Sequence, residues 1–343
     1  MQLQFARTLV ACGSLSLGIL MTNCLPASSA FLEADDVRID LPGTAEFRAE
    51  DPSEKRGHVM TLAVATTEDI NGWVTSMVEG AATVVSYLER RPSTAREGTT
   101  RIYGPYEDND GRDLSWLVRL DGNLAGSQFE LWVGSREAQS QDEMHKLLAG
   151  DLHIDGDKRS GGFMLDFDVV ELYPQMKGSY AADLYTYAGV VDVNFERDVS
   201  TEAKTITIDF QDVEVLYDGF LDSDKFNSDD TYVYERRDDG SGVYHLALFG
   251  EWDEWAWSGA EQEEMVLDMA WTPEGAGRAR GQMLEANGVG DLKYGDLLVH
   301  ECFDGDGYLT WRWVTEAYLA EDPDYNLGDE ATCTLTEADL INP

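Results

Sequence analysis

The sequence predicts a mainly β protein of the α+β class, a large curved antiparallel meander sheet with one long N-terminal helix packed on it. The sheet is expected to form a half-barrel or open barrel of about 10–12 strands. Three observations support this: strongly alternating strands over 161–217, one amphipathic helical stretch over 67–91, and Asp-Gly turns spread along the chain after Pro92. A helix followed by consecutive strands is the α+β order. A two-sheet sandwich is the alternative arrangement.

The stretch 161–217 contains three successive strands in which apolar side chains occupy every second position. In chain order these side chains are Phe163, Leu165, Phe167 and Val169, then Tyr185, Tyr187, Val191, Val193 and Phe195, then Ile206, Ile208 and Phe210. The parity changes after Phe210, which predicts a β-bulge near Gln211 and Asp212. One apolar and one polar face predict antiparallel pairing.

The first thirty residues have the composition of a secretory signal peptide. Arg7 is their only charge, an apolar run extends over 9–21, and Ser28-Ser29-Ala30 offers a cleavage site. We therefore expect an exported protein without a membrane span, located in the periplasm, at the outer membrane or outside the cell. A lipid anchor stays open, because the residues before Cys12 and Cys24 resemble a lipoprotein processing site.

After the signal peptide we expect a flexible lead-in over 31–62 and then a single domain over 63–343. The lead-in is predicted from its charges, its prolines and its lack of periodicity. The helix over 67–91 is predicted from an apolar stripe formed by Ile70, Trp73, Val74, Met77, Val78, Ala81, Val85 and Leu88. Thr66 or Thr67 is the expected N-cap, and Pro92 ends the helix.

Beyond Pro92 the sequence predicts short strands separated by turns. Besides the three strands of 161–217, they are expected near 115–120, 128–133, 147–154, 231–237, 242–252, 264–271, 278–285, 297–303 and 309–315.

Cys302 and Cys333 are the two cysteines that remain if the signal peptide is removed. In an oxidising compartment such a pair is expected to form a disulfide. A metal site is the weaker alternative, although His300 lies two residues from Cys302.

The net charge of −41 excludes nucleic acid and anionic membrane surfaces as partners. We expect no cofactor. Three acidic turns resemble calcium loops, at 108–111, 151–156 and 304–307, but none has a carboxylate at the twelfth position of an EF-hand. We interpret them as hairpin turns and expect no metal site, while weak Ca²⁺ binding by an acidic surface protein remains an alternative.

The segment 251–257 has the most unusual local composition. Trp252, Trp255 and Trp257 lie there among the carboxylates of Glu251, Asp253 and Glu254, as in a sugar-stacking platform, although packing of the aromatic rings against the fold is the simpler interpretation. We found no motif for nucleophilic, metal or nucleotide chemistry and so predict no catalytic residues. The strand histidines His245 and His300 are expected to be core or cross-strand residues with satisfied hydrogen bonds, and not metal ligands.

The C-terminal part contains Trp271, the run Gly275-Ala276-Gly277-Arg278-Ala279, Gly290-Asp291-Leu292, Glu301-Cys302-Phe303-Asp304 and a last Cys333. With Tyr103-Gly104-Pro105-Tyr106 and the strand 163–168, this pattern resembles a group of uncharacterised bacterial envelope proteins, often lipoproteins. The resemblance implies a β-rich body and no known activity.

These observations favour a non-catalytic exported protein of the cell envelope that binds an apolar ligand or presents an interaction surface. The competing hypothesis is a carbohydrate-binding module, or a glycoside hydrolase, that uses the segment 251–257.

Overall fold

A single antiparallel sheet of 15 strands dominates the computed structural model, which describes residues 32–42, 57–88, 91–108, 112–123, 126–176, 185–217, 225–228, 231–250, 263–285, 296–316 and 325–341. The strands are β1 (Ala95–Glu97), β2 (Thr100–Glu107), β3 (Leu114–Asn123), β4 (Gly126–Ser135), β5 (His145–Asp155), β6 (Lys158–Asp166), β7 (Tyr185–Asp198), β8 (Lys204–Tyr217), β9 (Lys225–Ser228), β10 (Thr231–Arg236), β11 (Gly242–Gly250), β12 (Glu263–Trp271), β13 (Gly277–Glu285), β14 (Leu297–Phe303) and β15 (Leu309–Val314).

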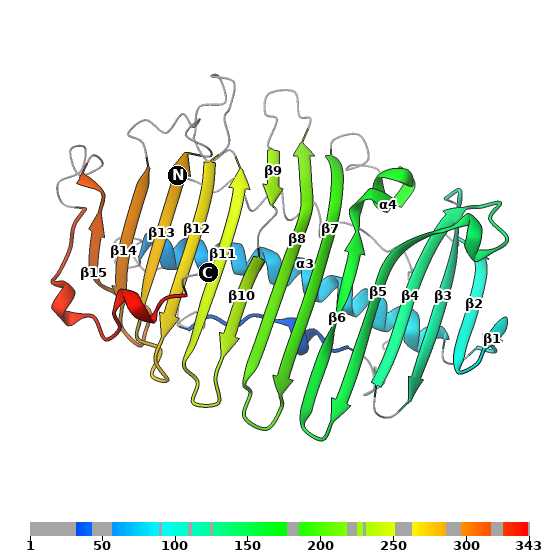
Figure 1. Cartoon of the computed structure of the whole chain (residues 1–343), viewed down its shortest axis with the longest axis horizontal. Coiled ribbons are helices and arrows are strands. Elements are labelled where there is room, and N and C mark those ends of the chain that lie inside the picture. The colour runs from blue at the N-terminus through cyan, green and yellow to red at the C-terminus, as the bar shows by residue number, and fades with distance from the viewer. Residues whose placement is uncertain are drawn as a thin grey trace.

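Strands that follow one another in the chain are neighbours in the sheet, from β1 at one edge to β15 at the other (Figure 1). Short β9 alone leaves this path and pairs with β8 and β11. The antiparallel meander is therefore confirmed, the sheet is open, and the sandwich alternative is wrong for the described strands. The predicted number of strands was too small, because β1, β2 and β9 carry no clear alternation.

The long helix α3 spans His58–Leu88 and crosses the sheet diagonally (Figure 1). The predicted helix over 67–91 is thus wrong in its bounds. Thr66 lies inside α3, where its hydroxyl donates to the carbonyl of Leu62 at 3.0 Å, so it is not an N-cap. Shorter helices are α2 (Ala34–Val37), α4 (Phe167–Leu172), η3 (Gln141–Glu143), η4 (Pro174–Met176), η6 (Glu330–Thr332) and η7 (Glu337–Asp339). No helix in the described ranges is long and apolar enough to cross a bilayer.

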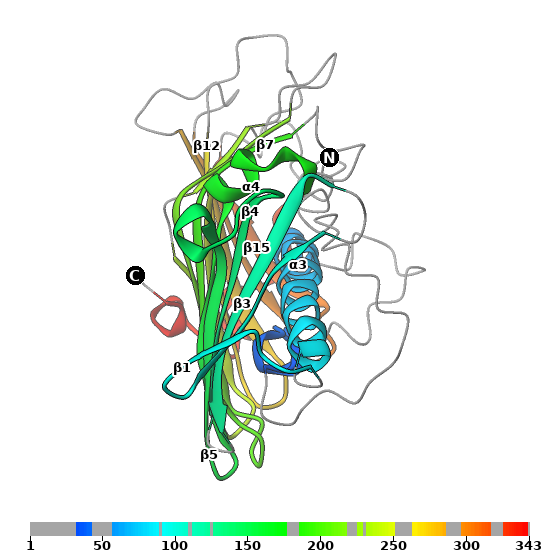
Figure 2. The same cartoon turned by 90° about the vertical axis from the view of Figure 1, so that its right-hand side faces the viewer.

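The two faces of the sheet differ in what covers them (Figure 2). We call the face under α3 the inner face and the opposite face, which carries the C-terminal segment, the outer face. The inner face and α3 share one hydrophobic core, in which the buried stripe of α3 includes Val59, Met60, Ala63, Ile70, Val74, Met77, Val78, Ala81, Val85 and Leu88. Helix and sheet therefore fill the space between them.

Residues 32–42 correct the prediction of a flexible lead-in. Leu32, Val37, Ile39 and Leu41 are buried in the same core, and Asp36 is 0% exposed. This segment runs behind the sheet on the inner face (Figure 1). These apolar residues are interspersed with charged ones in the sequence, and their burial holds the segment on the sheet.

The central strands contain one feature that the sequence predicts and one that it does not. The predicted bulge is confirmed: Ala188 pairs with Glu214 and Val190 with Gln211, and Asp212 has a positive φ of 50°. The predicted C-terminal end of the strand that contains Phe163, at Val169, is wrong. β6 stops at Asp166, whose carboxylate accepts the N–H of Val169 at 3.3 Å and starts α4.

Candidate binding site on the outer face

A shallow pocket of about 410 Å³ lies over the middle of β3–β7. Its floor includes Ala149 and Gly150 of β5 and Gly162 of β6. No side chain fits at Gly162, because its Cβ would collide with the backbone carbonyl of Val193. The sheet is therefore thin at this point, and the depression is a consequence of small residues in two adjacent strands.

Strand register places the polar residues of the pocket in a row across the sheet. Asp121 pairs with Gln128, Gln128 with Asp151, Asp151 with Gly162, and Gly162 with Asn194. These residues alternate with buried ones such as Phe129 and Phe163, which point to the core. Two carboxylates and two amides thus surround a gap that has no side chain.

A second row runs parallel to the first. Arg119 pairs with Glu130, Glu130 with Ala149, Ala149 with Met164, and Met164 with Asp192. Ala149 is again the smallest side chain and lies in the middle. Each row therefore has polar side chains at both ends, and a residue with a small side chain or none, Ala149 or Gly162, lies between them.

Glu130 is held in its charged form by its neighbours. Its carboxylate lies 2.7 Å from Lys146 Nζ and accepts a hydrogen bond from Trp132 Nε1 at 3.2 Å. Partial burial raises the pKa of Glu130, but the hydrogen bonds from Lys146 and Trp132 outweigh it, so the pKa lies below its ordinary value. The indole of Trp132 is therefore in direct contact with Glu130, which lines the pocket.

Asp192, at the other end of this row, has the opposite tendency. Burial and the nearby charge of Asp209 raise its pKa, while a hydrogen bond from Gln211 at 2.7 Å lowers it in part. The pocket therefore combines an acceptor that stays ionised with one that more readily takes a proton.

A second polar cluster lies on the same face under the C-terminal segment. His245 Nδ1 is 2.7 Å from Asp268 Oδ1, and Arg280 Nε and Nη2 donate to Asp268 Oδ2 at 2.9 and 2.6 Å. The three residues are direct cross-strand neighbours on β11, β12 and β13. Asp268 is 0% exposed, so the cluster is structural, as expected for His245.

His300 departs from its prediction in one respect. It is buried beside the rings of Trp311 and Trp313, at centroid distances of 6.5 and 5.7 Å. Its Nδ1 has no hydrogen-bond partner among the described residues. Burial lowers the pKa of His300, so the neutral form is favoured.

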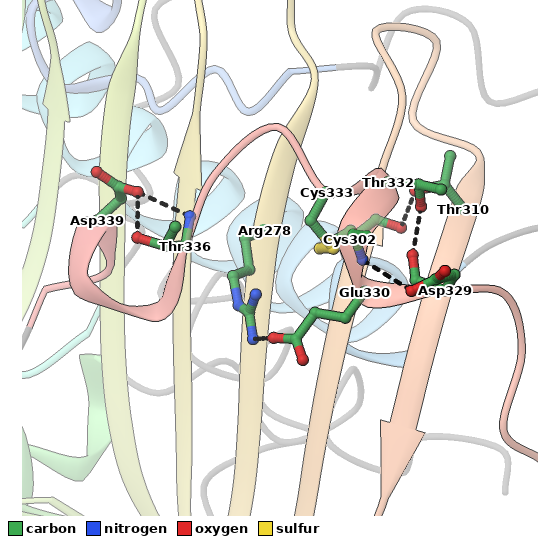
Figure 3. The surroundings of a disulfide bond; sticks show 10 residues. Arg278, Cys302, Thr310, Asp329, Glu330, Thr332, Cys333, Thr336 and Asp339 are labelled. Carbon is green, nitrogen blue, oxygen red and sulfur yellow. Dashed lines mark hydrogen bonds and ion pairs between the residues drawn. A yellow bond between two sulfur atoms is a disulfide. The ribbon is translucent and has the colours of Figure 1, made fainter.

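The predicted disulfide between Cys302 and Cys333 is present, with a Cα–Cα distance of 5.6 Å. It holds the C-terminal segment on the outer face, where Glu330 also accepts a hydrogen bond from Arg278 at 2.8 Å (Figure 3). Leu340 of the same segment packs against Val243 and Ala270. The segment is therefore attached by a covalent bond, an ion pair and an apolar contact.

Other predicted sites have different outcomes. Trp252, Trp255 and Trp257 lie outside the described residues, so the segment 251–257 stays a prediction. The turn at 304–307 is a hairpin turn as interpreted, because Asp304 Oδ1 accepts the N–H groups of Asp306 and Tyr308 at 3.0 and 2.9 Å. Across the described ranges, no three His, Cys, Asp or Glu side chains converge as a metal site requires.

Comparison with protein-family models, curated proteins and solved structures found no match to this chain. The resemblance to bacterial envelope proteins therefore stays a prediction. The fold is an open antiparallel meander with one face covered by a helix, and its other face presents a polar depression.

Proposed function

We propose that this chain is a non-catalytic exported binding protein of the cell envelope that presents the outer pocket to a neutral, hydroxyl-rich ligand of the saccharide class. The observation that supports it most is the thinned floor at Ala149 and Gly162, with carboxylates and amides around it. Carboxylates accept hydrogen bonds from hydroxyl groups, and amides both donate and accept them.

Charge and packing narrow the class of ligand. A chain with a net charge of −41 disfavours an anionic ligand at a pocket that contains four carboxylates, those of Asp121, Glu130, Asp151 and Asp192. An apolar ligand is disfavoured on the inner face, because α3 and residues 32–42 occupy it. Charge and packing together therefore favour an uncharged polar ligand on the outer face.

The test is a titration of the full chain with neutral oligosaccharides, followed by tryptophan fluorescence and calorimetry. Ala149→Leu should fill the pocket and weaken binding at least about tenfold, because bulk there excludes the ligand. Ala95→Leu is the matched control, since Ala95 is exposed on β1 and outside the pocket. It should leave binding unchanged.

Two results would contradict this proposal. One is the absence of saturable binding to any neutral oligosaccharide. The other is binding that survives Ala149→Leu but is lost in Trp255→Ala and Trp257→Ala, which would assign the ligand to the segment 251–257.

A further inference from the structure

Four cations lie side by side on the inner face, one on each of four adjacent strands. They are Arg159 on β6, Arg197 on β7, Lys204 on β8 and Arg236 on β10, and we call them the cation row. Arg159 pairs directly with Arg197, Arg197 with Lys204, and Lys204 with Arg236. Like charges directly opposite in a sheet destabilise it, so the row needs anions.

Segment 32–42 supplies a carboxylate, that of Asp36, which pairs with the cation at one end of the row. Arg159 Nε and Nη2 donate to the two carboxylate oxygens of Asp36 at 2.8 and 2.7 Å, and Asp36 is 0% exposed. Two parallel bonds of this kind satisfy one guanidinium and one carboxylate. Asp36 thus has little capacity left for the rest of the row.

The other three cations have weaker carboxylate contacts within the described residues. Arg197 Nη1 is 3.5 Å from Asp36, Lys204 Nζ is 3.9 Å from Asp40, and Arg236 Nη1 is 3.8 Å from Glu202. Burial lowers the pKa of Lys204 although Asp40 raises it, so the ammonium is incompletely compensated. Lys204 also donates to the carbonyl of Arg38 at 2.8 Å.

These three cations and Arg38 line a pocket of about 200 Å³ on this side of the sheet. Its carboxylates belong to Asp35, Asp40 and Glu202, and the side chains of Asp40 and Glu202 are 47% and 68% exposed. Two of the cations are deeper, since the side chains of Lys204 and Arg197 are 8% and 15% exposed, whereas those of Arg236 and Arg38 lie at the rim. Buried Lys204 and Arg197 beneath exposed carboxylates favour an incoming anion, because these two cations keep their charge inside while the carboxylates can be hydrated at the rim.

We propose that this pocket binds a compact tetrahedral oxyanion, a phosphate or sulfate group, through Arg197, Lys204 and Arg236. Guanidinium groups match the geometry of such oxyanions with two parallel N–H donors each. The site is independent of the outer pocket, because it lies on the opposite face of the sheet. In a chain with 25 basic and 66 acidic residues, this pocket is lined by four cations and three carboxylates, which reduces the repulsion of an anion there.

The experiment is calorimetric titration of the full chain with inorganic phosphate and, separately, inorganic sulfate, at an ionic strength matched with chloride. We expect saturable binding of at least one of them at one site. Arg236→Gln should weaken it about tenfold or more, since it removes a charge-assisted donor. Its side chain is 36% exposed with one long ion pair, so the variant should fold. Arg38→Gln, 59% exposed, should weaken binding too.

Arg237→Gln is the matched control. Arg237 follows Arg236 in the chain, is 50% exposed and pairs with Glu235 at 2.8 Å, outside the pocket. It should leave the affinity within about twofold of the original, which is the scatter expected of a surface change. Ala149→Leu should likewise leave anion binding unchanged. The proposal is overturned if neither anion binds saturably, or if Arg236→Gln and Arg237→Gln weaken binding equally, which indicates diffuse attraction.

Discussion

The backbone N–H of His58, the first residue of α3, donates to Oε1 of Glu301 at 2.7 Å across 243 residues of chain. The N–H of Val59 donates to Oε2 of the same carboxylate at 2.9 Å. The first N–H groups of a helix have no partner inside it, and its N-terminus attracts negative charge. Glu301 of β14 therefore caps α3 from the sheet and fixes where the helix begins.

The first prediction concerns the pH dependence of this cap. Burial raises the pKa of Glu301 from 4.5 to about 7, although the N–H groups of His58 and Val59 and the charge of Arg312 lower it. The folded state thus holds the proton more tightly than the unfolded state. The tighter binding of this proton stabilises the folded state fully below about pH 4.5. This stabilisation is lost as the pH rises to about 7, and the free energy of unfolding then no longer changes with the titration of Glu301. Its size is roughly 3 kcal/mol.

Urea unfolding of the protein and of Glu301→Gln between pH 5 and pH 8, a range chosen around a pKa of about 7, checks this. The difference between the two free energies of unfolding should change across this range, since Gln does not titrate. Glu274→Gln is the control, because Glu274 is exposed in a turn. A Glu301→Gln profile parallel to that of the original protein would contradict the prediction.

The second prediction concerns Gly57, which precedes α3. A Cβ there would collide with Oε2 of Glu301 and lie 2.9 Å from its Cδ. Gly57→Ala should therefore displace the cap and lower the free energy of unfolding by about 2 kcal/mol or more.

Gly72→Ala makes the matched comparison within α3. A Cβ at Gly72 meets nothing within 4 Å, and the residue is exposed. Because glycine is unfavourable inside a helix, this change should raise the free energy of unfolding by about 0.5–1 kcal/mol. Opposite signs in the two variants are expected, and a loss of similar size in both would be inconsistent with the cap.

The start of α3 shows why sequence reasoning placed the helix incorrectly. Val59, Met60 and Ala63 continue its apolar stripe, so a signal was present. The predicted helix begins after Thr66 and Thr67 because these residues are the local N-cap candidates. The actual cap, Glu301, comes from a strand far along the chain, and no local pattern contains it.

Alternation identified the central strands and their bulge, because a half-buried strand imposes it residue by residue. The pockets could not be predicted in this way, since they depend on register. Ala149 lies beside Met164, and Arg197 beside Lys204, only after the strands pair. The pair Gly161-Gly162 inside a strand pattern was the available signal for the outer pocket.

The third prediction concerns the disulfide. Cys302 and Cys333 close a loop with a sequence separation of 31 residues. Replacing both with Ala should lower the free energy of unfolding by roughly 3–4 kcal/mol in the chain-entropy model. Urea unfolding of the variant checks this, and mass analysis of the unreduced protein should find no free thiol at either position. Two free thiols in the unreduced protein would contradict the structure of the C-terminal segment.

The fourth prediction concerns Asp268, which is 0% exposed and contacts both His245 and Arg280. Asp268→Asn leaves the Arg280 guanidinium without its short carboxylate contact beneath the C-terminal segment. Removing one member of a buried charge pair costs about 3–5 kcal/mol, so we expect a loss of at least roughly 3 kcal/mol in urea unfolding.

A double-mutant cycle separates this pair from general damage to the sheet. If the ion pair carries the effect, Asp268→Asn combined with Arg280→Gln should cost clearly less than the sum of the single changes, because the second change removes a charge that the first leaves with only the longer contact to Glu337 at 3.6 Å. Asp306→Asn, in the exposed turn between β14 and β15, is the control and should stay within about 0.5 kcal/mol. Additive losses at Asp268 and Arg280 would instead mean that each residue supports the outer face separately and that the short contact between them contributes little.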